Sequence, residues 1–187
     1  MITFWKSGYE TTSISELLAV MNISAPSLYT AFGDKQRLFI EAVDLYVSIY
    51  GDPIHAALSD APTARDGVEL LLAFAITEHL RPTTPKGCML VTAAASGSGS
   101  SLDVQEHLAA LRSDQRNLIK ARIERGINEG DVPHGADASA LSYFYSTILQ
   151  GMSIQARGGV KRQALENVAA LAMNSWPASE SSREKAQ

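Results

Sequence analysis

The side chains best suited to chemistry gather in one stretch near the start of the chain, residues 11–39. Ser27, Tyr29 and Thr30 carry hydroxyl groups, and Lys35 carries a cation a few positions later. Hydroxyl groups, ammonium groups and the backbone N–H groups at helix starts are donors with which proteins bind phosphates and contact base edges. The stretch therefore predicts hydrogen bonding to nucleic acid rather than the making or breaking of covalent bonds.

Two short helices are expected to hold these donors. The capping-box sequence at 13–16 starts one helix, and Asn22 ends it. Ser24 then caps a second helix, with Pro26 in its first turn, where a missing N–H costs little. This second helix, from Ala25 to Phe32, is roughly 12 Å long, which suits a major groove about 12 Å wide. The pattern is that of a helix-turn-helix.

The order and spacing of residues 4–39 resemble the DNA-binding segment of the TetR/AcrR family of one-component bacterial repressors. The matching residues are Gly8, Tyr9, Thr12, Ile23, Ser24, Ser27, Leu28, Tyr29, Phe32, Asp34, Lys35, Leu38 and Phe39. The resemblance implies an all-α protein, with an N-terminal helix-turn-helix DNA-binding domain followed by a helical ligand-binding and dimerisation domain. It also implies a homodimer that represses transcription on double-stranded operator DNA.

The resemblance assigns DNA contacts to eight residues: Thr12, Ser13, Ala25, Pro26, Ser27, Tyr29, Thr30 and Lys35. Thr12, Tyr29 and Lys35 are expected to bind phosphates, and Ser27 and Thr30 to lie nearest the base edges. Family members often have Lys where Ala25 stands and a basic or His residue where Ala31 stands. These departures predict weak, salt-sensitive DNA binding with few direct hydrogen bonds to bases.

The charge of the first fifty residues runs against strong DNA binding. This segment contains three cations and five acids, which gives a net charge of 3 − 5 = −2. DNA-binding domains usually carry a basic face. Compared with the family, the first helix is cut short at Met1 to Ser7. Either the true start lies upstream of Met1, or the domain is built on a shortened helix; the missing portion usually contributes basic residues.

The rest of the chain predicts a helical second domain. A connecting helix runs from Lys35 to about Tyr50, and the Gly51-Asp52-Pro53 sequence is expected to break or kink it, with a loop over residues 58–64. Further helices are predicted from 64 to the prolines at 82 and 85, and over 87–95, 103–128, 138–157 and 162–176, with a flexible loop at 97–101. The basic residues of 103–128 are expected to form a solvated face. The predicted division is 1–45, 46–176 and a disordered tail, 177–187.

The last two predicted helices carry more apolar surface than one core needs, which favours a dimer interface. The residues assigned to it are Tyr145, Ile148, Leu149, Leu165, Val168, Leu171 and Ala172. The remaining helices of the second domain predict a chamber for a small, mainly apolar effector. The residues expected to line it are Phe74, Glu78, His79, Met89, Thr92, Tyr143, Phe144 and Met152.

Catalytic and metal chemistry find little support in the sequence. The four histidines stand singly without metal-ligand spacing, and Cys88 lies in an apolar run where an inert core thiol is expected. We therefore predict a protein that is not an enzyme and needs no cofactor. A helical enzyme would rest only on Cys88 and His79.

Composition completes the sequence-based picture. The 187 residues are 45% hydrophobic and 19% charged, as in an ordinary globular protein. A single cysteine, the absence of a leader and the absence of a membrane-length apolar run predict a cytoplasmic protein that does not enter a membrane. The preferred interpretation is a ligand-responsive repressor on a palindromic operator. The alternative is a helical ligand-binding or dimerisation protein that has lost DNA binding.

Overall fold

The computed structural model describes residues 1–95 and 102–177, and every regular element in these residues is a helix. The predicted all-α fold is therefore confirmed. In chain order the elements are α1 (Ile2–Ser7), α2 (Ile14–Met21), α3 (Ala25–Phe32), α4 (Lys35–Tyr46), the π-helical turn η1 (Val47–Gly51), α5 (Asp52–Asp60), α6 (Ala64–His79), α7 (Met89–Ala95), α8 (Leu102–Glu129), α9 (Ala138–Arg157) and α10 (Arg162–Asn174). The predicted loop at 97–101 and nearly all of the predicted tail lie outside the described residues.

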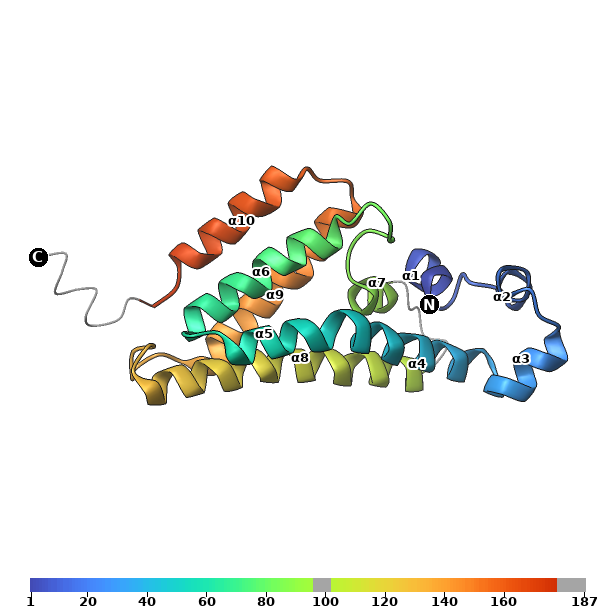
Figure 1. Ribbon diagram of the computed structural model, residues 1–187, viewed down its shortest axis with the longest axis horizontal. Coiled ribbons are helices and arrows are strands. Elements are labelled where there is room, and N and C mark those ends of the chain that lie inside the picture. Colours follow the sequence, from blue (N-terminus) through green and yellow to red (C-terminus); the bar gives the residue numbers. More distant parts are fainter. Residues whose placement is uncertain (96–101, 178–187) are drawn as a thin grey trace, which may run out of the picture.

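The helices form an elongated molecule with two different ends (Figure 1). The segment α4-η1-α5 runs along most of its length, with α8 packed beside it. Helices α6, α9 and α10 stack on α5 and α8 at one end, while α1, α2 and α3 form the other. One continuous segment therefore joins the helix-turn-helix to the second domain.

The predicted break at Gly51-Asp52-Pro53 is wrong, whereas the loop predicted over 58–64 is present but shorter, at residues 61–63. The chain stays helical from Lys35 to Asp60, passing through η1 without leaving the helix direction. Pro53 lies in the first turn of α5. A wider turn just before it accommodates the missing N–H and the bulk of the proline ring, which would otherwise clash with the preceding turn.

Five helix starts follow from a single capping side chain. Ser13, Ser24, Asp34, Thr63 and Asp137 each accept a hydrogen bond from the backbone N–H three residues later. At the C-terminal end of α2, Asn22 adopts the left-handed conformation with φ 53°, as predicted. The local signals therefore determine where the helix-turn-helix begins and turns.

The core of the first domain extends into the second. Leu28 of α3 and Phe39 of α4 are fully buried in a cluster that also contains Met89 of α7 and Leu108 of α8. Trp5 of α1 joins the same cluster and donates a hydrogen bond from Nε1 to the carbonyl of Gly87, 3.1 Å away. The three N-terminal helices are thus held against the second domain by packing as well as by the connecting segment.

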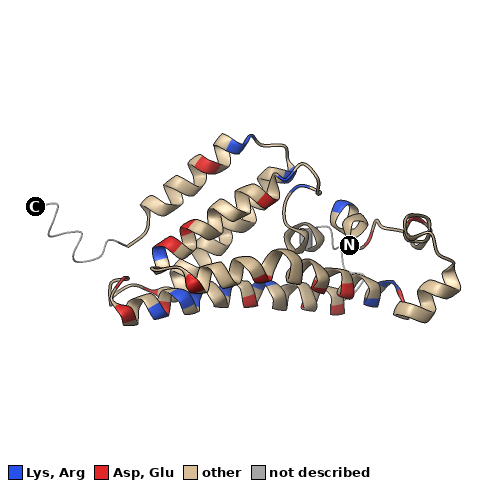
Figure 2. Ribbon diagram, in the orientation of Figure 1, with Lys and Arg blue, Asp and Glu red and all other residues tan. Residues whose placement is uncertain are grey.

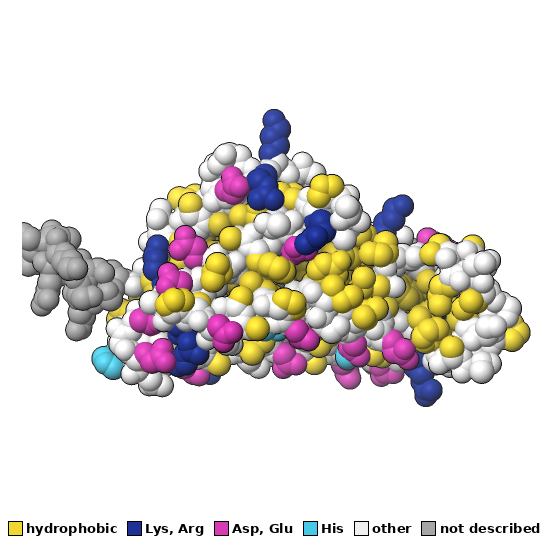
Figure 3. Space-filling model, in the orientation of Figure 1, with side chains coloured by type: hydrophobic (Ala, Val, Ile, Leu, Met, Phe, Trp, Pro, Cys, Tyr) yellow, Lys and Arg dark blue, Asp and Glu magenta, His cyan; other side chains and the backbone are white. Residues whose placement is uncertain are grey.

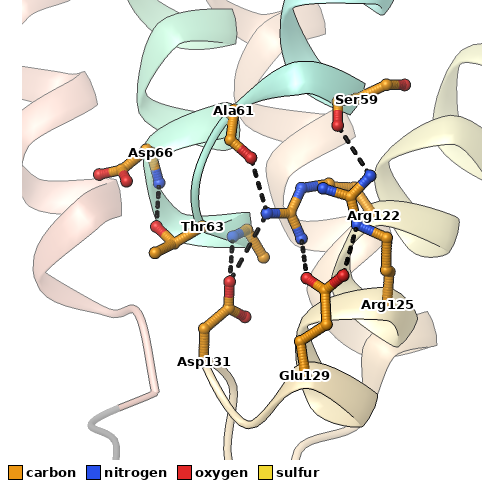
Figure 4. Close-up of polar contacts among 9 residues, drawn as sticks. Ser59, Ala61, Thr63, Asp66, Arg122, Arg125, Glu129 and Asp131 are labelled. Carbon is orange, nitrogen blue, oxygen red and sulfur yellow. Dashed lines mark hydrogen bonds and ion pairs between the residues drawn. The ribbon is translucent and has the colours of Figure 1, made fainter.

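A polar cluster closes the far end of the second domain (Figure 4). Buried Arg122 donates to the carbonyl of Ala61 over 3.0 Å and lies 3.6 Å from a carboxylate oxygen of Asp131. The same Asp131 oxygen accepts the backbone N–H of Ala64 at the start of α6. This carboxylate therefore holds α6 and α8 together, and its charge also stabilises the N-terminus of α6.

None of the helices in residues 1–95 and 102–177 is both long enough and apolar enough to cross a lipid bilayer.

Candidate nucleic-acid interface and ligand chamber

Helix α3 is held on its inner side and open on its outer side. Leu28 is completely buried, whereas Ser27, Tyr29 and Thr30 are exposed, with Tyr29 48% exposed. The Ser27 hydroxyl lies 2.9 Å from the hydroxyl of Ser24, the residue that caps the helix. Among the other predicted contact residues, Ser13 and Pro26 are exposed and Ala25 is half-buried. One face of α3 thus presents hydroxyl groups to solvent.

Thr12 does not share that face, and its predicted side-chain contact with a phosphate needs correction. Its side chain is fully buried, and its hydroxyl donates to the carbonyl of Gly8 over 2.6 Å. A β-hydroxyl two residues before a helix readily bonds to nearby backbone, which the motif alone does not reveal. Thr12 therefore fixes the turn between α1 and α2.

Lys35 is half-buried at the start of α4 rather than free in solvent. Its Nζ lies 4.5 Å from the centre of the Tyr9 ring and donates to the carbonyl of Glu10 over 3.4 Å. Burial lowers the pKa of Lys35 from its ordinary value, and the nearby Glu10 charge partly offsets this. The ammonium group of Lys35 is thus held in place beside α3 by the Tyr9 ring and the Glu10 carbonyl.

The outer surface of α2 and α3 carries little charge. Helix α3 has no charged residue and α2 has only Glu16 (Figure 2). In the space-filling view, this end of the molecule shows mainly hydrophobic and uncharged polar side chains (Figure 3). Contacts made by this surface must therefore come mostly from hydroxyl groups and from the N–H groups at helix starts.

The second domain contains a partly open cavity of about 100 Å³, which we call the chamber. Its walls come from α4, η1 and α5 on one side, α6 on a second, and α8 and α9 on a third, with Cys88 and Val91 near α7 closing the remainder. Apolar side chains dominate the walls; among them are Ile54, Leu58, Leu71, Phe74, Ile119 and Leu149. A pocket of this kind suits a small ligand with an apolar body.

Three of the eight residues predicted to line the chamber do so, namely Phe74, Glu78 and His79. Met89, Thr92 and Met152 are buried in packing instead, and Phe144 is 39% exposed. Tyr143 is exposed beside a second hollow on the outer side of α8 and α9. The predictions for these five residues are corrected, because a helix pattern shows which residues are apolar but not which neighbour each one faces.

Sequence reasoning missed most of the chamber wall, including Tyr46, Tyr50, Arg112 and Arg116. For the two arginines, the spacing of residues along α8 could have indicated a place in the chamber wall. Arg112 and Arg116 follow the buried Leu108 at successive intervals of four, and therefore lie on the side that packs inward. Cations at such positions indicate a polar wall inside a domain rather than the solvated face that composition favours.

The polar groups of the chamber differ in how they are partnered. Glu78 accepts two hydrogen bonds from Arg81, one of them 2.8 Å long. His79 is buried, and burial lowers its pKa to about 4, against a small opposing effect of Glu78. Within the part of the chain that the structure describes, Nδ1 of His79 is buried without a hydrogen-bond partner. At neutral pH this histidine is therefore uncharged.

Models of two domain families match the chain. The one described as bacterial regulatory proteins, tetR family, matches residues 1–42. The one described as tetracyclin repressor-like, C-terminal domain, matches residues 67–172, more than half of the chain. The chain belongs to the TetR family.

Individual relatives of this TetR-family chain are repressors. The HTH-type transcriptional repressor ComR of Escherichia coli K12 is 28% identical over 178 residues, which cover 95% of this chain and 85% of ComR. The repressor BdcR of the same organism is 26% identical over 172 residues, which cover 91% and 82%. This TetR-family chain is accordingly a transcriptional regulator, and its family and relatives are regulators rather than enzymes.

A solved structure agrees over nearly the whole fold. A cysteine mutant of the TetR family transcriptional regulator CifR, complexed with 26-bp double-strand operator DNA, is 38% identical and superposes with a TM-score of 0.91. The match covers 94% of this chain and 92% of that chain. The arrangement of α1 to α3 relative to the second domain is therefore that of a solved TetR regulator.

The residues predicted for a dimer interface divide into two groups. Tyr145, Leu165 and Ala172 are buried within the chain, and the Tyr145 hydroxyl donates to the carbonyl of Ala172 over 3.1 Å. Leu149 lines the chamber, and Ile148 is half-buried. Only Val168, 38% exposed, and Leu171, 67% exposed, are open to solvent. The assignments of Tyr145, Leu165 and Ala172 are corrected, because these residues are buried where α9 packs on α10 within one chain. The assignments of the other four residues stay predictions.

Proposed function

We propose that this TetR-family repressor is ligand-responsive and binds a two-fold symmetric operator in the cytoplasm as a homodimer. A small ligand in the chamber releases the DNA. The observation that carries the proposal is the continuous segment α4-η1-α5. Its first residue lies beside α3, and Tyr46, Tyr50 and Gly51 farther along it line the chamber. A ligand that displaces this segment therefore also moves α3, the helix expected to enter the major groove.

The exposed face of α3 supplies the contacts to DNA. Ser27 and Thr30 meet base edges in the major groove, and Tyr29, Ser13 and Lys35 bind phosphates on either side. Ala25 and Pro26 allow the start of α3 to approach the backbone closely, since neither side chain is large. Thr12 acts indirectly, because its hydroxyl is used within the protein. Few cations take part, so affinity per protomer is modest and a dimer is needed.

The dimer forms through the exposed apolar faces of α9 and α10. Phe144 and Ile154 of α9 are 39% and 56% exposed, and Val168 and Leu171 of α10 are also exposed. Gly151 lies between the two α9 residues, with open space where a side chain would stand. A helix from a second copy can therefore pack closely there. Two-fold symmetry would set the two α3 helices about 34–36 Å apart, or a multiple of that distance.

An aromatic group links the chamber to the DNA-binding helices. The ring of Trp5 in α1 contacts Tyr46 and Tyr50, with ring centres 4.9 Å and 5.4 Å apart. Both tyrosines also line the chamber. A ligand that moves them must therefore shift Trp5, and with it the hydrogen bond from Trp5 to Gly87. The π-helical turn that carries Tyr50 can change its winding at little cost, because it is already irregular.

The test uses the DNA that flanks the protein's own coding region. Binding of the full-length protein to labelled fragments of this DNA is measured by fluorescence anisotropy against a scrambled duplex of equal composition. We expect one fragment to be preferred. Thr30→Ala should lower affinity for it by roughly 5- to 150-fold for each half-site that the dimer occupies, because recognition of one base is worth about 1–3 kcal/mol, without changing affinity for the scrambled duplex.

Thr77→Ala is the matched control, because Thr77 is an exposed threonine on α6, outside the helix-turn-helix. It should change neither affinity. Equal binding to all fragments and to the scrambled duplex at physiological salt contradicts the proposal.

One observation favours the alternative of a ligand-binding or dimerisation protein without DNA binding. Helix α3 carries no charge, and the first fifty residues sum to 3 − 5 = −2. The absence of preferred fragments in the anisotropy experiment, together with retained ligand binding, would support this alternative. Hydroxyl donors and helix starts nevertheless bind phosphate without net charge, so the repressor remains our proposal.

A further inference from the structure

The wall of the chamber has an excess of positive charge. Arg112 and Arg116 of α8 are cations, and Glu78 is the single acid among the described lining residues. Arg81, which lies outside the wall, already neutralises Glu78. His79 is uncharged because of its lowered pKa. Two arginines therefore face the chamber without a compensating charge in its wall.

The two arginines differ from the other cations of α8. Lys120, Arg122 and Arg125 each form an ion pair with an acid. Arg112 donates to the carbonyl of Leu90 and Arg116 to the hydroxyl of Ser113, but neither forms an ion pair with any carboxylate in the described residues. A guanidinium has five N–H donors. Most donors of these two side chains are available to a ligand.

The position of the arginines makes them a polar rim around an apolar chamber. Residues 112 and 116 are one turn apart on α8, and Ser146 and Gln150 of α9 lie with them. The same four residues also line the second hollow, which has a volume of about 360 Å³ and lies between α8 and α9. The Arg116 guanidinium lies over the Tyr143 ring, 4.5 Å from its centre, on the side of this hollow. The arginines thus stand where the chamber meets the outer hollow, and any ligand entering there passes them.

The size of the chamber limits the ligand. The chamber has a volume of about 100 Å³. If each non-hydrogen atom of a ligand takes the roughly 10–15 Å³ that one water needs, about seven to ten such atoms fit. The walls beyond the rim are apolar, contributed by Phe74, Leu71 and Ile54 among others. An ion burying most of its surface there must direct its charge to the rim, because an unpaired charge among apolar groups is strongly disfavoured.

We infer that the ligand of the chamber is a small monocarboxylate: an apolar body of one ring or a short branched chain, with its carboxylate held by Arg112 and Arg116. The planar guanidinium matches a carboxylate with two parallel hydrogen bonds, which favours this anion over a spherical one. The inference rests on the proposed function, since it gives the chemistry of the same chamber. It is nevertheless tested without DNA.

Three probes of the same size and shape test the charge: benzoate, benzamide and benzamidinium, which are anionic, neutral and cationic. Binding to the full-length protein is measured by isothermal titration calorimetry at neutral pH. We expect benzoate to bind at least about tenfold tighter than benzamide, the lower end of what a charge-assisted hydrogen bond contributes. Benzamidinium should bind least. Equal affinities, a preference for benzamide or benzamidinium, or no binding of benzoate at millimolar concentration each overturns the inference.

Two variants test the residues. Arg112→Gln and Arg116→Gln keep a polar side chain but remove the charge, so each should lower benzoate affinity by about 10- to 150-fold. Neither should change benzamide affinity, which separates a role in charge recognition from general damage to the chamber. Lys120→Gln is the matched control, because Lys120 lies on the same helix but pairs with Glu124 away from the chamber. If Lys120→Gln weakens benzoate as much, or if both arginine variants leave benzoate unchanged, the assignment is wrong.

Failure of this inference can be distinguished from failure of the repressor proposal. Benzoate that binds as expected but leaves operator affinity unchanged confirms the chemistry of the chamber and contradicts the ligand response. Sequence-specific DNA binding without any benzoate binding supports the repressor and rejects the monocarboxylate.

Discussion

The helix-turn-helix and the chamber lie at different points along one helical segment, and they use charge in opposite ways. At the DNA-binding end α3 has no charged residue, and Lys35 is already engaged with Tyr9 and Glu10. In the chamber two arginines face a small apolar space, and neither pairs with an acid within residues 1–95 and 102–177. The surface expected to meet a polyanion is nearly neutral, whereas the interior site is cationic.

This difference leads to a physical expectation about each site. Hydrogen bonds from hydroxyl groups and backbone N–H groups release few counterions, so DNA binding should depend less on salt than the sequence suggests. It should depend instead on geometry and on the presence of two protomers. Arginines inside a domain are poorly screened by salt, so charge should dominate ligand choice in the chamber. DNA recognition then depends on how the dimer holds its two α3 helices, which makes it sensitive to small movements of α4.

The largest effect is expected from breaking the dimer. Leu171 is 67% exposed on α10, and replacing it by Arg would bury a charge in the proposed interface. Leu171→Arg should convert the protein to a monomer at micromolar concentration and remove specific operator binding, while leaving benzoate affinity unchanged. Analytical ultracentrifugation measures the first effect. Leu45→Arg, at an exposed leucine on α4, is the control and should remain dimeric. A dimeric Leu171→Arg protein contradicts this interface.

The next largest effect is expected from removing the buried side chain that anchors α3. Leu28 is completely buried, so Leu28→Ala should reduce the free energy of unfolding by about 2–5 kcal/mol, because apolar packing is removed and a cavity remains. Chemical denaturation measures the change, and Val20→Ala at a site 67% exposed should cost far less. At a temperature where the variant is folded, DNA affinity should fall more than ligand affinity. Equal loss at both sites would indicate that α3 and the chamber are not separable.

A pH effect should come from the chamber. His79 has a pKa of about 4 in the folded chain against an ordinary value of 6.5. The unfolded chain therefore binds a proton between these values that the folded chain does not, and the free energy of unfolding falls as the pH falls from 6.5 towards 4. The decrease from this group is at most about 3 kcal/mol.

The measurement compares denaturation of the wild type and of His79→Gln over that range. The wild type should lose more stability on acidification than the variant. His134→Gln, at an exposed histidine, should behave as the wild type. Parallel curves for wild type and His79→Gln would show that His79 does not titrate as described.

The smallest expected effect is at Lys35. Lys35→Ala should weaken binding to all DNA sequences alike and flatten the slope of log affinity against log salt by about 0.9 for each phosphate that is no longer neutralised, hence by about two in a dimer. Lys161→Ala, at an exposed lysine before α10, should leave the slope unchanged. A decrease in affinity confined to the specific operator would mean that Lys35 takes part in sequence recognition instead.

The DNA-binding end could be predicted from sequence because its determinants are local. Ser13, Ser24 and Asp34 each cap the helix that begins at the next residue, and Asn22 ends α2 and begins the turn to α3. The bounds of α9 likewise follow in full from the cap at Asp137 and the glycine after Arg157. Such signals act within one helical turn, so no knowledge of the rest of the fold is needed.

The chamber could not be predicted in this way, because its wall is assembled from helices distant in sequence. Tyr50, His79, Arg112 and Leu149 meet only after the whole domain has packed. The π-helical turn is hidden from sequence for the same reason. The glycine and proline near residue 51 predict a break, and only packing against α6 and α8 keeps α5 in line with α4. The buried hydroxyl of Thr12 also depends on a backbone turn that the motif does not specify.

Ligand in the chamber and DNA on α3 should each weaken the binding of the other. The most direct measurement determines benzoate affinity with and without saturating operator duplex, and operator affinity with and without saturating benzoate, on the same preparation. Linkage requires the two affinities to fall by the same factor, and we expect this factor to lie between about 5 and 150. If benzoate binds equally well to the free protein and to the protein–DNA complex, the chamber does not control the DNA-binding helices and the account is contradicted.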